Sequence, residues 1–330
     1  MIAPCDIAAA AQLACLLEVS APKPGNVSPG RHFADTRYED FLASAAAIGA
    51  PLGGAGTRPL GATIRLAVEA TSRWCRSNTN LGIVLLLAPL ARAAASGSDP
   101  GDARDWGQTP ESAASGSDPS EARDWGQTPE FGDSGIPSAV DSSLQKLRTA
   151  VGQVLNATTV DDAREVYAAI RLAAPGGLGQ TDSQDVAGEP TMTLVEVMRL
   201  AAERDGLARE YATAFEVTFA SGAPALARAR RDGLTWDDAV VETFLTLVAA
   251  FPDTHVRRRA GADAARMVSE RADAALAAGG VRSEEGRRAI AAMDAALRDA
   301  RNSANPGTAA DLTAAAIFVM LLTGEWHRSA

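Results

Sequence analysis

The sequence predicts an all-α protein, a single multi-helix domain over residues 1–330 with about ten helices and one low-complexity insertion. Apolar residues recur at helical spacing along most of the chain, beginning with Ile7, Leu13 and Leu17. Strand signals are almost absent, because no run alternates β-branched and aromatic residues with polar ones. Alanine is abundant and aromatic residues make up only 5% of the chain, a composition that favours helices packed through small side chains.

The charge and cysteine content argue against several classes of protein. Lys and Arg number 31 against 41 Asp and Glu, and a net charge of −10 disfavours a nucleic-acid or anionic-membrane surface. The three cysteines form no CxxC pair, which argues against a disulfide scaffold or a thiolate zinc site and fits a reducing cytoplasm. The longest apolar run, residues 81–90, is about half the ~20 residues of a membrane-spanning helix, so we expect a cytoplasmic protein with a buried helix there.

Residues 96–138 contain a duplication. Most of the stretch from Ser96 to Glu111 recurs nineteen positions later, and Gly, Ser, Asp and Pro dominate both copies. Two copies are too few for a solenoid, which needs about three stacked repeats. We therefore expect a disordered surface insertion within the domain, with a small binding tag built on Trp106 and Trp125 as the alternative.

Capping residues mark the helix starts before the insertion. Thr36, with Glu39 three residues later, forms a capping-box pattern ahead of the second helix. Pro59 suits the first position of the third helix. Asn78 or Thr79 can cap the apolar helix that follows, because a short polar side chain there accepts from a free backbone amide.

After the insertion, the same pattern predicts four more helix starts. A Thr with an acidic residue three positions later precedes three apolar runs, and Ser283 precedes another. The three pairs are Thr193–Glu196, Thr235–Asp238 and Thr308–Asp311. The remaining polar residues gather in the connections between helices, which is where we expect the chemistry.

The first polar connection, residues 18–27, carries a lysine on a stiff segment. Pro22 and Pro24 bracket Lys23, and Gly25 allows the backbone to approach a ligand closely. A rigid lysine beside exposed amides suits a phosphate oxygen. The alternative is a helix end with a Pro-Gly turn and a solvated lysine.

Two further connections offer polar groups before the insertion. In residues 30–35, His32 and Asp35 can ligate a metal or transfer a proton, and Arg31 can bind phosphate; a purely structural His and an Asp that assists the next helix are the alternative. Asn80 lies with Asn78 and Thr79 at a helix start, which is a natural anion site. Simple helix capping explains part of this pattern.

The fourth connection follows an apolar helix and is unusually basic for an acidic protein. Asp253 and His255 are candidate metal or base residues, and Arg257 is a candidate phosphate ligand. The arginines over residues 257–259 form a solvated helix face in the alternative interpretation. Asp311 lies on the first turn of the last predicted helix.

The set of polar residues suits a polyphosphate bound with Mg²⁺. The chain has no nucleophile elbow, HExxH motif, EF-hand or Cys/His zinc spacing, and a glycine-rich loop at residues 174–185 matches no phosphate-binding fingerprint. Carboxylate oxygens hold Mg²⁺ in part, and phosphate oxygens complete its coordination shell.

Four of these segments resemble the signature of the triphosphoribosyl-dephospho-CoA synthases (ATP:dephospho-CoA triphosphoribosyltransferases). They are Glu18-Val19-Ser20 with Pro22-Lys23-Pro24-Gly25, Asn78-Thr79 opening an apolar helix, Asp253-Thr254-His255, and Asn305-Pro306-Gly307 with Ala310-Asp311-Leu312. The matches occur in family order and cover the chain except for residues 96–138. The family usually reads Asn-Thr-His-Lys-Gly where this chain has Asn78-Thr79-Asn80-Leu81-Gly82.

The resemblance implies an all-helical enzyme that transfers a triphosphoribosyl group from Mg·ATP to the ribose 2′-hydroxyl of 3′-dephospho-CoA and releases adenine. The implied catalytic residues are Glu18, His32, Asp35 and His255, with His32 or His255 as the base. The implied substrate- and phosphate-binding residues are Lys23, Asn26, Arg31, Asn78, Thr79, Asn80 and Arg257. The implied metal ligands are Asp253 and Asp311.

Three other functions stay open at this point, one of which is an enzyme that transfers or hydrolyses a phosphate group of a nucleotide. The Asn80-Leu81 replacement is compatible with a divergent member that acts on another acceptor, for example in one-carbon or pterin-cofactor metabolism. A nucleotide-binding helical protein without this activity is the third alternative. Alanine-rich helical faces also pack well against copies of themselves, so a homodimer is a further expectation.

Overall fold

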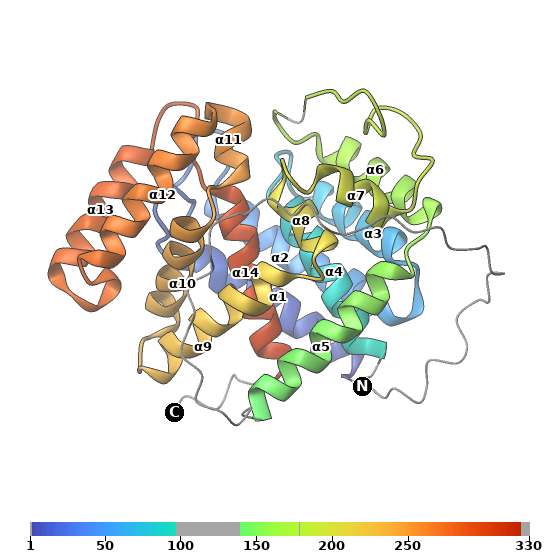
Figure 1. The fold of residues 1–330 in the computed structure, drawn as a ribbon, viewed down its shortest axis with the longest axis horizontal. Coiled ribbons are helices and arrows are strands. Elements are labelled where there is room, and N and C mark those ends of the chain that lie inside the picture. The colour runs from blue at the N-terminus through green and yellow to red at the C-terminus, as the bar shows by residue number, and fades with distance from the viewer. Residues whose placement is uncertain (1, 97–138, 178, 325–330) are drawn as a thin grey trace, which may run out of the picture.

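A computed structural model describes residues 2–96, 139–177 and 179–324 (Figure 1). Within these ranges the chain forms fourteen α-helices and no β-sheet, which confirms the predicted all-α class. The α-helices are α1 (Pro4–Ser20), α2 (Tyr38–Gly53), α3 (Leu60–Ser72), α4 (Leu81–Ser96), α5 (Ala139–Asn156), α6 (Val160–Ala173), α7 (Leu194–Ala201), α8 (Gly206–Ala212), α9 (Ala223–Arg231), α10 (Trp236–Ala250), α11 (Thr254–Ala260), α12 (Ala262–Ala277), α13 (Glu284–Leu297) and α14 (Gly307–Leu322).

The number of helices exceeds the expected ten because several helices are short. The helices α8 and α11 have seven residues each, too few for an apolar period to mark them in the sequence. The duplicated segment lies almost wholly at residues 97–138, outside the described residues. No helix in the described ranges is both long and apolar enough to cross a membrane.

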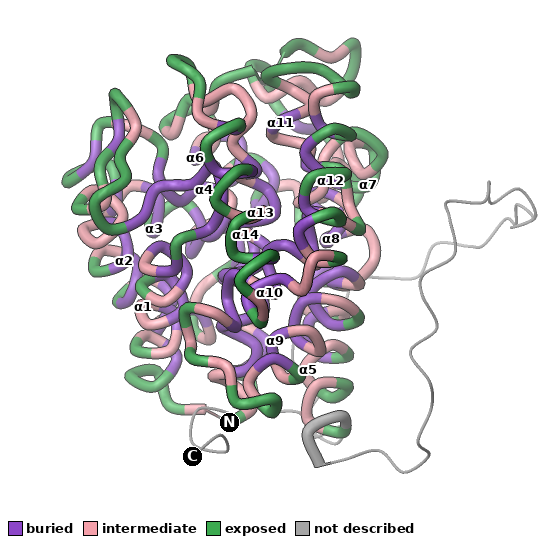
Figure 2. Tube along the Cα trace, turned by 90° about the vertical axis from the view of Figure 1, so that its left-hand side faces the viewer, coloured by how far each residue is buried: buried purple, intermediate pink, exposed green. Residues whose placement is uncertain are grey.

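Two helices form the centre of the molecule. The apolar helix predicted at residues 81–90 is α4, and its side chains are almost all buried. The last helix, α14, is buried along nearly its whole length and packs against α1, α4, α9 and α10 (Figure 2). Around this centre, α1, α2, α3 and α6 pack in succession, and α10, α12 and α13 form a second group.

Several predicted helix starts are confirmed. Thr193 and Thr235 precede α7 and α10, and the Oγ atom of Ser283 accepts the amide of Gly286 at 2.9 Å. The Oδ1 atom of Asn78 accepts the backbone amide of Leu81 at 3.0 Å, so it satisfies a free amide at the start of α4.

Two predicted caps are wrong. The second helix begins at Tyr38, and Asp40, not Glu39, accepts the backbone amide of Arg37 at 2.7 Å; the hydroxyl of Thr36 lies outside the helix and donates to Asp35 and to Ser77, at 3.2 Å each. The last helix begins before Thr308, whose hydroxyl contacts Thr254 of α11 at 3.0 Å. In both cases a tertiary hydrogen bond replaces the expected local one.

Candidate active site

One large cavity lies where the central helices begin. Its volume is about 1080 Å³, and residues of α6, α7 and α11 line it. Figure 1 shows α11 apart from α6 and α7, which lie near each other. The wall of the cavity includes the C-terminal end of α1 and the N-terminal ends of α4 and α14. The N-terminal end of a helix carries free backbone amides and a partial positive charge, so two long helices here favour an anionic ligand.

Nine of the thirteen predicted site residues line this cavity. They are Glu18, Asn26, Asp35, Asn78, Thr79, Asn80, His255, Arg257 and Asp311. They come from segments separated by up to about 290 positions, so the fold brings most of the predicted polar connections together. The other four, Lys23, Arg31, His32 and Asp253, lie in the surrounding structure.

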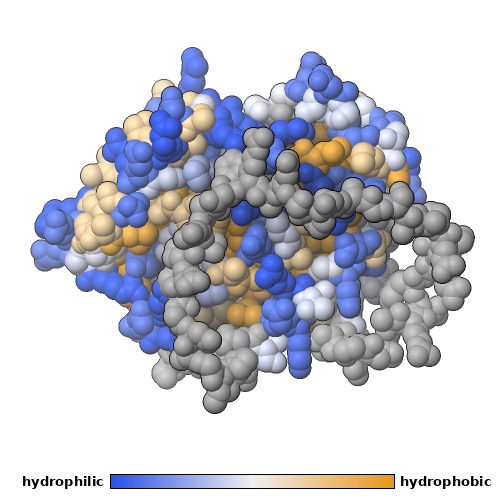
Figure 3. Space-filling model, viewed as in Figure 1, coloured by the Kyte–Doolittle hydropathy of each residue, from blue (hydrophilic) through white to orange (hydrophobic). Residues whose placement is uncertain are grey.

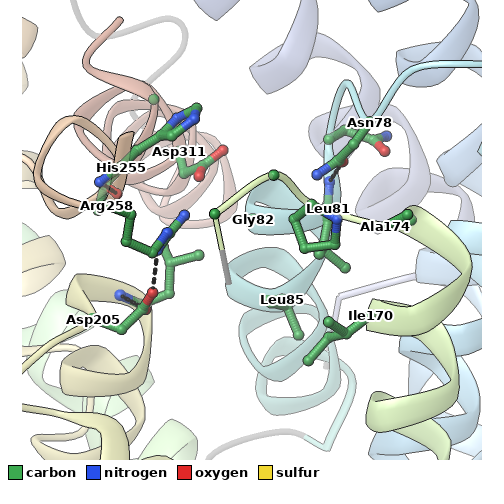
Figure 4. A pocket seen from close by; sticks show the side chains of 18 of the residues that line it. Asn78, Leu81, Gly82, Leu85, Ile170, Ala174, Asp205, His255, Arg258 and Asp311 are labelled. Carbon is green, nitrogen blue, oxygen red and sulfur yellow. Dashed lines mark hydrogen bonds and ion pairs between the residues drawn. The ribbon is translucent and has the colours of Figure 1, made fainter. Parts of the chain in front are cut away.

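Asp311 lines the cavity, and Figure 4 shows its carboxylate on the same side as His255 and Arg258. Gly82 of α4 lies so close to it that a Cβ atom on Gly82 would overlap the carboxylate. Burial raises the pKa of Asp311 well above its usual range, and the negative charges of Glu18 and Asp253 raise it further. A cation bound beside Asp311 would favour the ionised carboxylate, because its positive charge would offset the cost of burying a negative one.

Lys23 holds Glu18 and does not face the cavity. Its side chain is 1% exposed, and its ammonium lies 2.9 Å from the Oε1 atom of Glu18. It also donates to the backbone carbonyls of Glu18 and Ala21 at the end of α1. The predicted phosphate ligand is therefore fully occupied, and Glu18 presents the cavity with a carboxylate already paired to a cation.

Arg31 and His32 lie beside a second, shallower cavity on α13. The carboxylate of Asp294 pairs with Arg31, accepts the backbone amide of Gly25 at 2.8 Å and pairs with Arg298 at 2.9 Å. The Nδ1 atom of His32 accepts the amide of Tyr38 at 3.1 Å. The contacts of Asp294 anchor the segment around Gly25 to α13.

Asp253 ties the starts of α11 and α14 together. Its Oδ1 atom accepts the amides of His255 and Val256 at 2.8 and 3.0 Å, and its Oδ2 atom accepts the amide of Ala309 at 2.8 Å. Burial raises its pKa to about 6 despite these hydrogen bonds. Backbone amides at the starts of α11 and α14 thus occupy both oxygens of Asp253, so its burial here requires no bound metal.

His255 lies in the cavity wall against Gly307 of α14. Its side chain is half-buried, and burial, together with the positive charges of Arg258 and Arg259, lowers its pKa to about 4. The imidazole is therefore neutral near pH 7 and has a nitrogen able to accept a proton. Figure 4 shows His255 and Asp311 on the same side of the cavity.

Further arginines line the cavity. Arg258 forms an ion pair with Asp205 at 2.5 Å, and Arg76, Arg204 and Arg301 also contribute to the wall. Arg257 is the predicted phosphate ligand in the run at 257–259, yet Arg258 is the arginine drawn beside Asp311 (Figure 4). Helical spacing could have indicated Arg258, because it lies three positions after His255, on the same face of α11.

The residues of the cavity could hold Mg²⁺ only together with oxygen atoms of a bound ligand. Across the residues that the structure describes, no group of three His, Cys, Asp or Glu side chains is placed to hold a metal. Asp311 faces the cavity, whereas the Asp253 oxygens are occupied. Mg²⁺ commonly takes one or two carboxylates and completes its shell with phosphate oxygens and water, which this arrangement permits.

Comparisons with known proteins point to one family. A family model described as ATP:dephospho-CoA triphosphoribosyl transferase matches residues 4–329. A crystal structure from Archaeoglobus fulgidus is described as that of a "putative triphosphoribosyl-dephospho-coA synthase". It superposes with a TM-score of 0.56 and 27% identity, and the match covers 86% of this chain and 99% of that one.

Two relatives bear the name "probable 2-(5''-triphosphoribosyl)-3'-dephosphocoenzyme-A synthase". The relative from Stutzerimonas stutzeri (strain A1501) is 37% identical over 117 residues, which is 35% of this chain and 40% of the relative. The relative from Azotobacter vinelandii (strain DJ / ATCC BAA-1303) is 29% identical over 170 residues, 52% of this chain and 57% of the relative. The matched parts therefore span about half the length of these relatives.

Proposed function

The chain belongs to the ATP:dephospho-CoA triphosphoribosyl transferase family, and we propose that it transfers a triphosphoribosyl group from Mg·ATP to the ribose 2′-hydroxyl of 3′-dephospho-CoA. The observation that carries this proposal is the convergence of Glu18, His255 and Asp311 on one cavity at the starts of α4 and α14. Two long helix N-termini and several arginines supply the positive potential that a triphosphate requires.

The reaction exchanges one bond at the anomeric carbon of the ATP ribose. The bond to adenine breaks, adenine leaves with the electron pair, and the acceptor's 2′-oxygen bonds to the same carbon. The proton that this hydroxyl loses balances the proton that adenine gains, with solvent exchanging protons between the two. The sugar gains positive charge as adenine departs, so the carboxylates of Glu18 and Asp311 stabilise it electrostatically. When bound, Mg²⁺ would neutralise part of the triphosphate charge, with Asp311 as a carboxylate placed to hold it.

His255 is the residue we assign to the hydroxyl proton. It lines the cavity beside Asp311 and stays neutral near pH 7, because its pKa is lowered to about 4. Such an imidazole is a weak base, but the hydroxyl becomes strongly acidic once its oxygen begins to bond to the positively charged sugar. A proton that moves after the new bond has begun to form can therefore be accepted by a weak base such as His255. His32, the other predicted base, lies outside this cavity and has no part in the proposal.

The test is to incubate the purified protein with Mg·ATP and 3′-dephospho-CoA and to measure free adenine and the product mass. Adenine and the triphosphoribosylated product should form together, and adding EDTA should suppress both. Asp311→Asn and His255→Gln should each lower kcat by about 10²-fold or more, whereas Asp161→Asn, at a side chain 85% exposed, should not. Release of ADP or phosphate in place of adenine would contradict the proposal, as would transfer only to a different acceptor.

A further inference from the structure

The cavity has two chemically different sides (Figure 4). One side carries Asp311, His255 and Arg258, and the other carries Ile170 of α6 and Leu85 of α4. A ligand that fills the whole volume of about 1080 Å³ must therefore have a charged part and an apolar part. The apolar side has no place in the chemistry described above.

Aliphatic side chains from two helices cover this apolar side. Leu172 at the end of α6 and Leu200 on α7 both line the cavity and are 48% and 50% exposed. Val197 and the buried Met198 of α7 also line the cavity. Single exposed leucines are common, but two on different helices that line one cavity form an apolar surface for a ligand. Hydrophobic surface over the region of α7 is visible in Figure 3.

A glycine-rich loop leads from the end of α6 toward α11, where a Cβ atom on Gly177 would lie 3.5 Å from the carbonyl oxygen of Arg258. Gly177 and Gly179 line the cavity with φ values of +77° and +72°, a conformation that favours glycine. The loop is held in shape by Asp185, whose carboxylate accepts the amides of Thr181 and Ala187 at 2.7 and 2.8 Å. Because glycine has no side chain, the peptide groups of this loop can approach a ligand and form hydrogen bonds with it.

We propose that Leu172 and Leu200, together with Gly177 and Gly179 of the loop, form a subsite for the uncharged pantetheine arm of the acceptor. This inference rests on the proposed function, because it concerns the second substrate of that reaction. The arm is a flexible chain of methyl, methylene and amide groups, and it needs aliphatic contacts with peptide hydrogen-bond partners. The planar adenine of ATP is better suited to an aromatic ring, and Phe33 and Phe41 also line the cavity.

Leu200→Asn and Leu172→Asn test the subsite, because both side chains are about half exposed and their loss should leave the fold intact. The probes are 3′-dephospho-CoA, ADP, which is the same molecule without the arm, and Mg·ATP, each titrated by calorimetry. Each variant should bind dephospho-CoA on the order of tenfold more weakly and should bind ADP and Mg·ATP as the wild type does. Leu66→Asn, at a leucine 40% exposed on α3 that lies outside the cavity wall, is the matched control.

The outcomes separate this inference from the proposed function. If the wild type releases adenine with dephospho-CoA but the two variants bind it with unchanged affinity, the subsite is overturned and the function stands. Weaker binding of Mg·ATP instead of dephospho-CoA would assign the apolar side to adenine and overturn the subsite in another way. If the wild type binds Mg·ATP but no dephospho-CoA, both proposals fail.

Discussion

The ammonium of Lys23 lies 2.9 Å from the Oε1 atom of Glu18, and both side chains are at most 5% exposed. The two residues are five positions apart, across the end of α1, and the ion pair holds Glu18 in the wall of the cavity. Lys23 thereby contributes to the site without touching the ligand space. Its role is to position Glu18 and to neutralise a charge that would otherwise be buried alone.

Removing this ammonium should destabilise the whole protein. Lys23→Met leaves the Glu18 carboxylate buried without its partner, which costs about 3–5 kcal/mol in comparable pairs. The double variant Lys23→Met/Glu18→Gln should regain part of this loss, because it has no unpaired charge. Urea unfolding of the wild type, both single variants and the double variant measures the coupling. A Lys23→Met variant as stable as the wild type, with only weaker ATP binding, would instead show Lys23 to be a direct phosphate ligand.

Asp294→Asn should loosen the segment around Gly25. The carboxylate joins α13 to the Gly25 amide and to two arginines, and hydrogen bonds to a charged group contribute about 1.5–3 kcal/mol each. We expect lower stability and faster hydrogen exchange at the Gly25 amide, measured by native-state exchange. Asp263→Asn, at a side chain 92% exposed, is the control. Unchanged exchange at Gly25 would disprove this anchoring role.

Gly82→Ala should reduce activity without reducing stability. The added methyl group would overlap the Asp311 carboxylate, a side chain that can swing away, so the fold survives while Asp311 leaves its position. Alanine inside α4 should raise helix stability by up to about 1 kcal/mol. Thermal unfolding and adenine release measure the two effects. Gly152→Ala in α5, where the new Cβ meets only an ordinary contact at 3.7 Å, should keep full activity.

The stability contributed by His255 should depend on pH. Its folded-state pKa is lowered to about 4 from an ordinary value of 6.5, so the unfolded chain binds the proton more tightly. This residue therefore leaves stability unchanged above pH 6.5 and lowers it progressively as the pH falls toward 4. At pH 5 the loss is on the order of 2 kcal/mol.

Urea unfolding of the wild type and His255→Gln at pH 7.5 and pH 5 checks this sign. The variant should lose less stability than the wild type on acidification. The comparison also removes the contribution of Asp253, which both proteins share and whose raised pKa acts in the opposite direction. An equal loss in both proteins would mean that His255 titrates normally in the folded state.

Local signals in the sequence determined the helical class and many of the helix starts. The apolar period predicted α4, and the pattern of a Thr with an acidic residue three positions later predicted α7 and α10, because both depend on residues within one or two turns. The polar connections were also visible, since charged residues between apolar helices stand out. Residue spacing and family resemblance together predicted nine residues of the cavity wall.

Only the tertiary structure decided which charged groups face the cavity. Lys23, Arg31 and Asp253 look like ligands in the sequence, yet each is occupied by a partner that the fold supplies. Asp294 and Ala309, two of these partners, lie more than fifty positions away along the chain. A buried charge must find a partner or lose its charge, and which partner is near depends on how the helices pack. That dependence on packing is why residue type and spacing could not distinguish a ligand from a support.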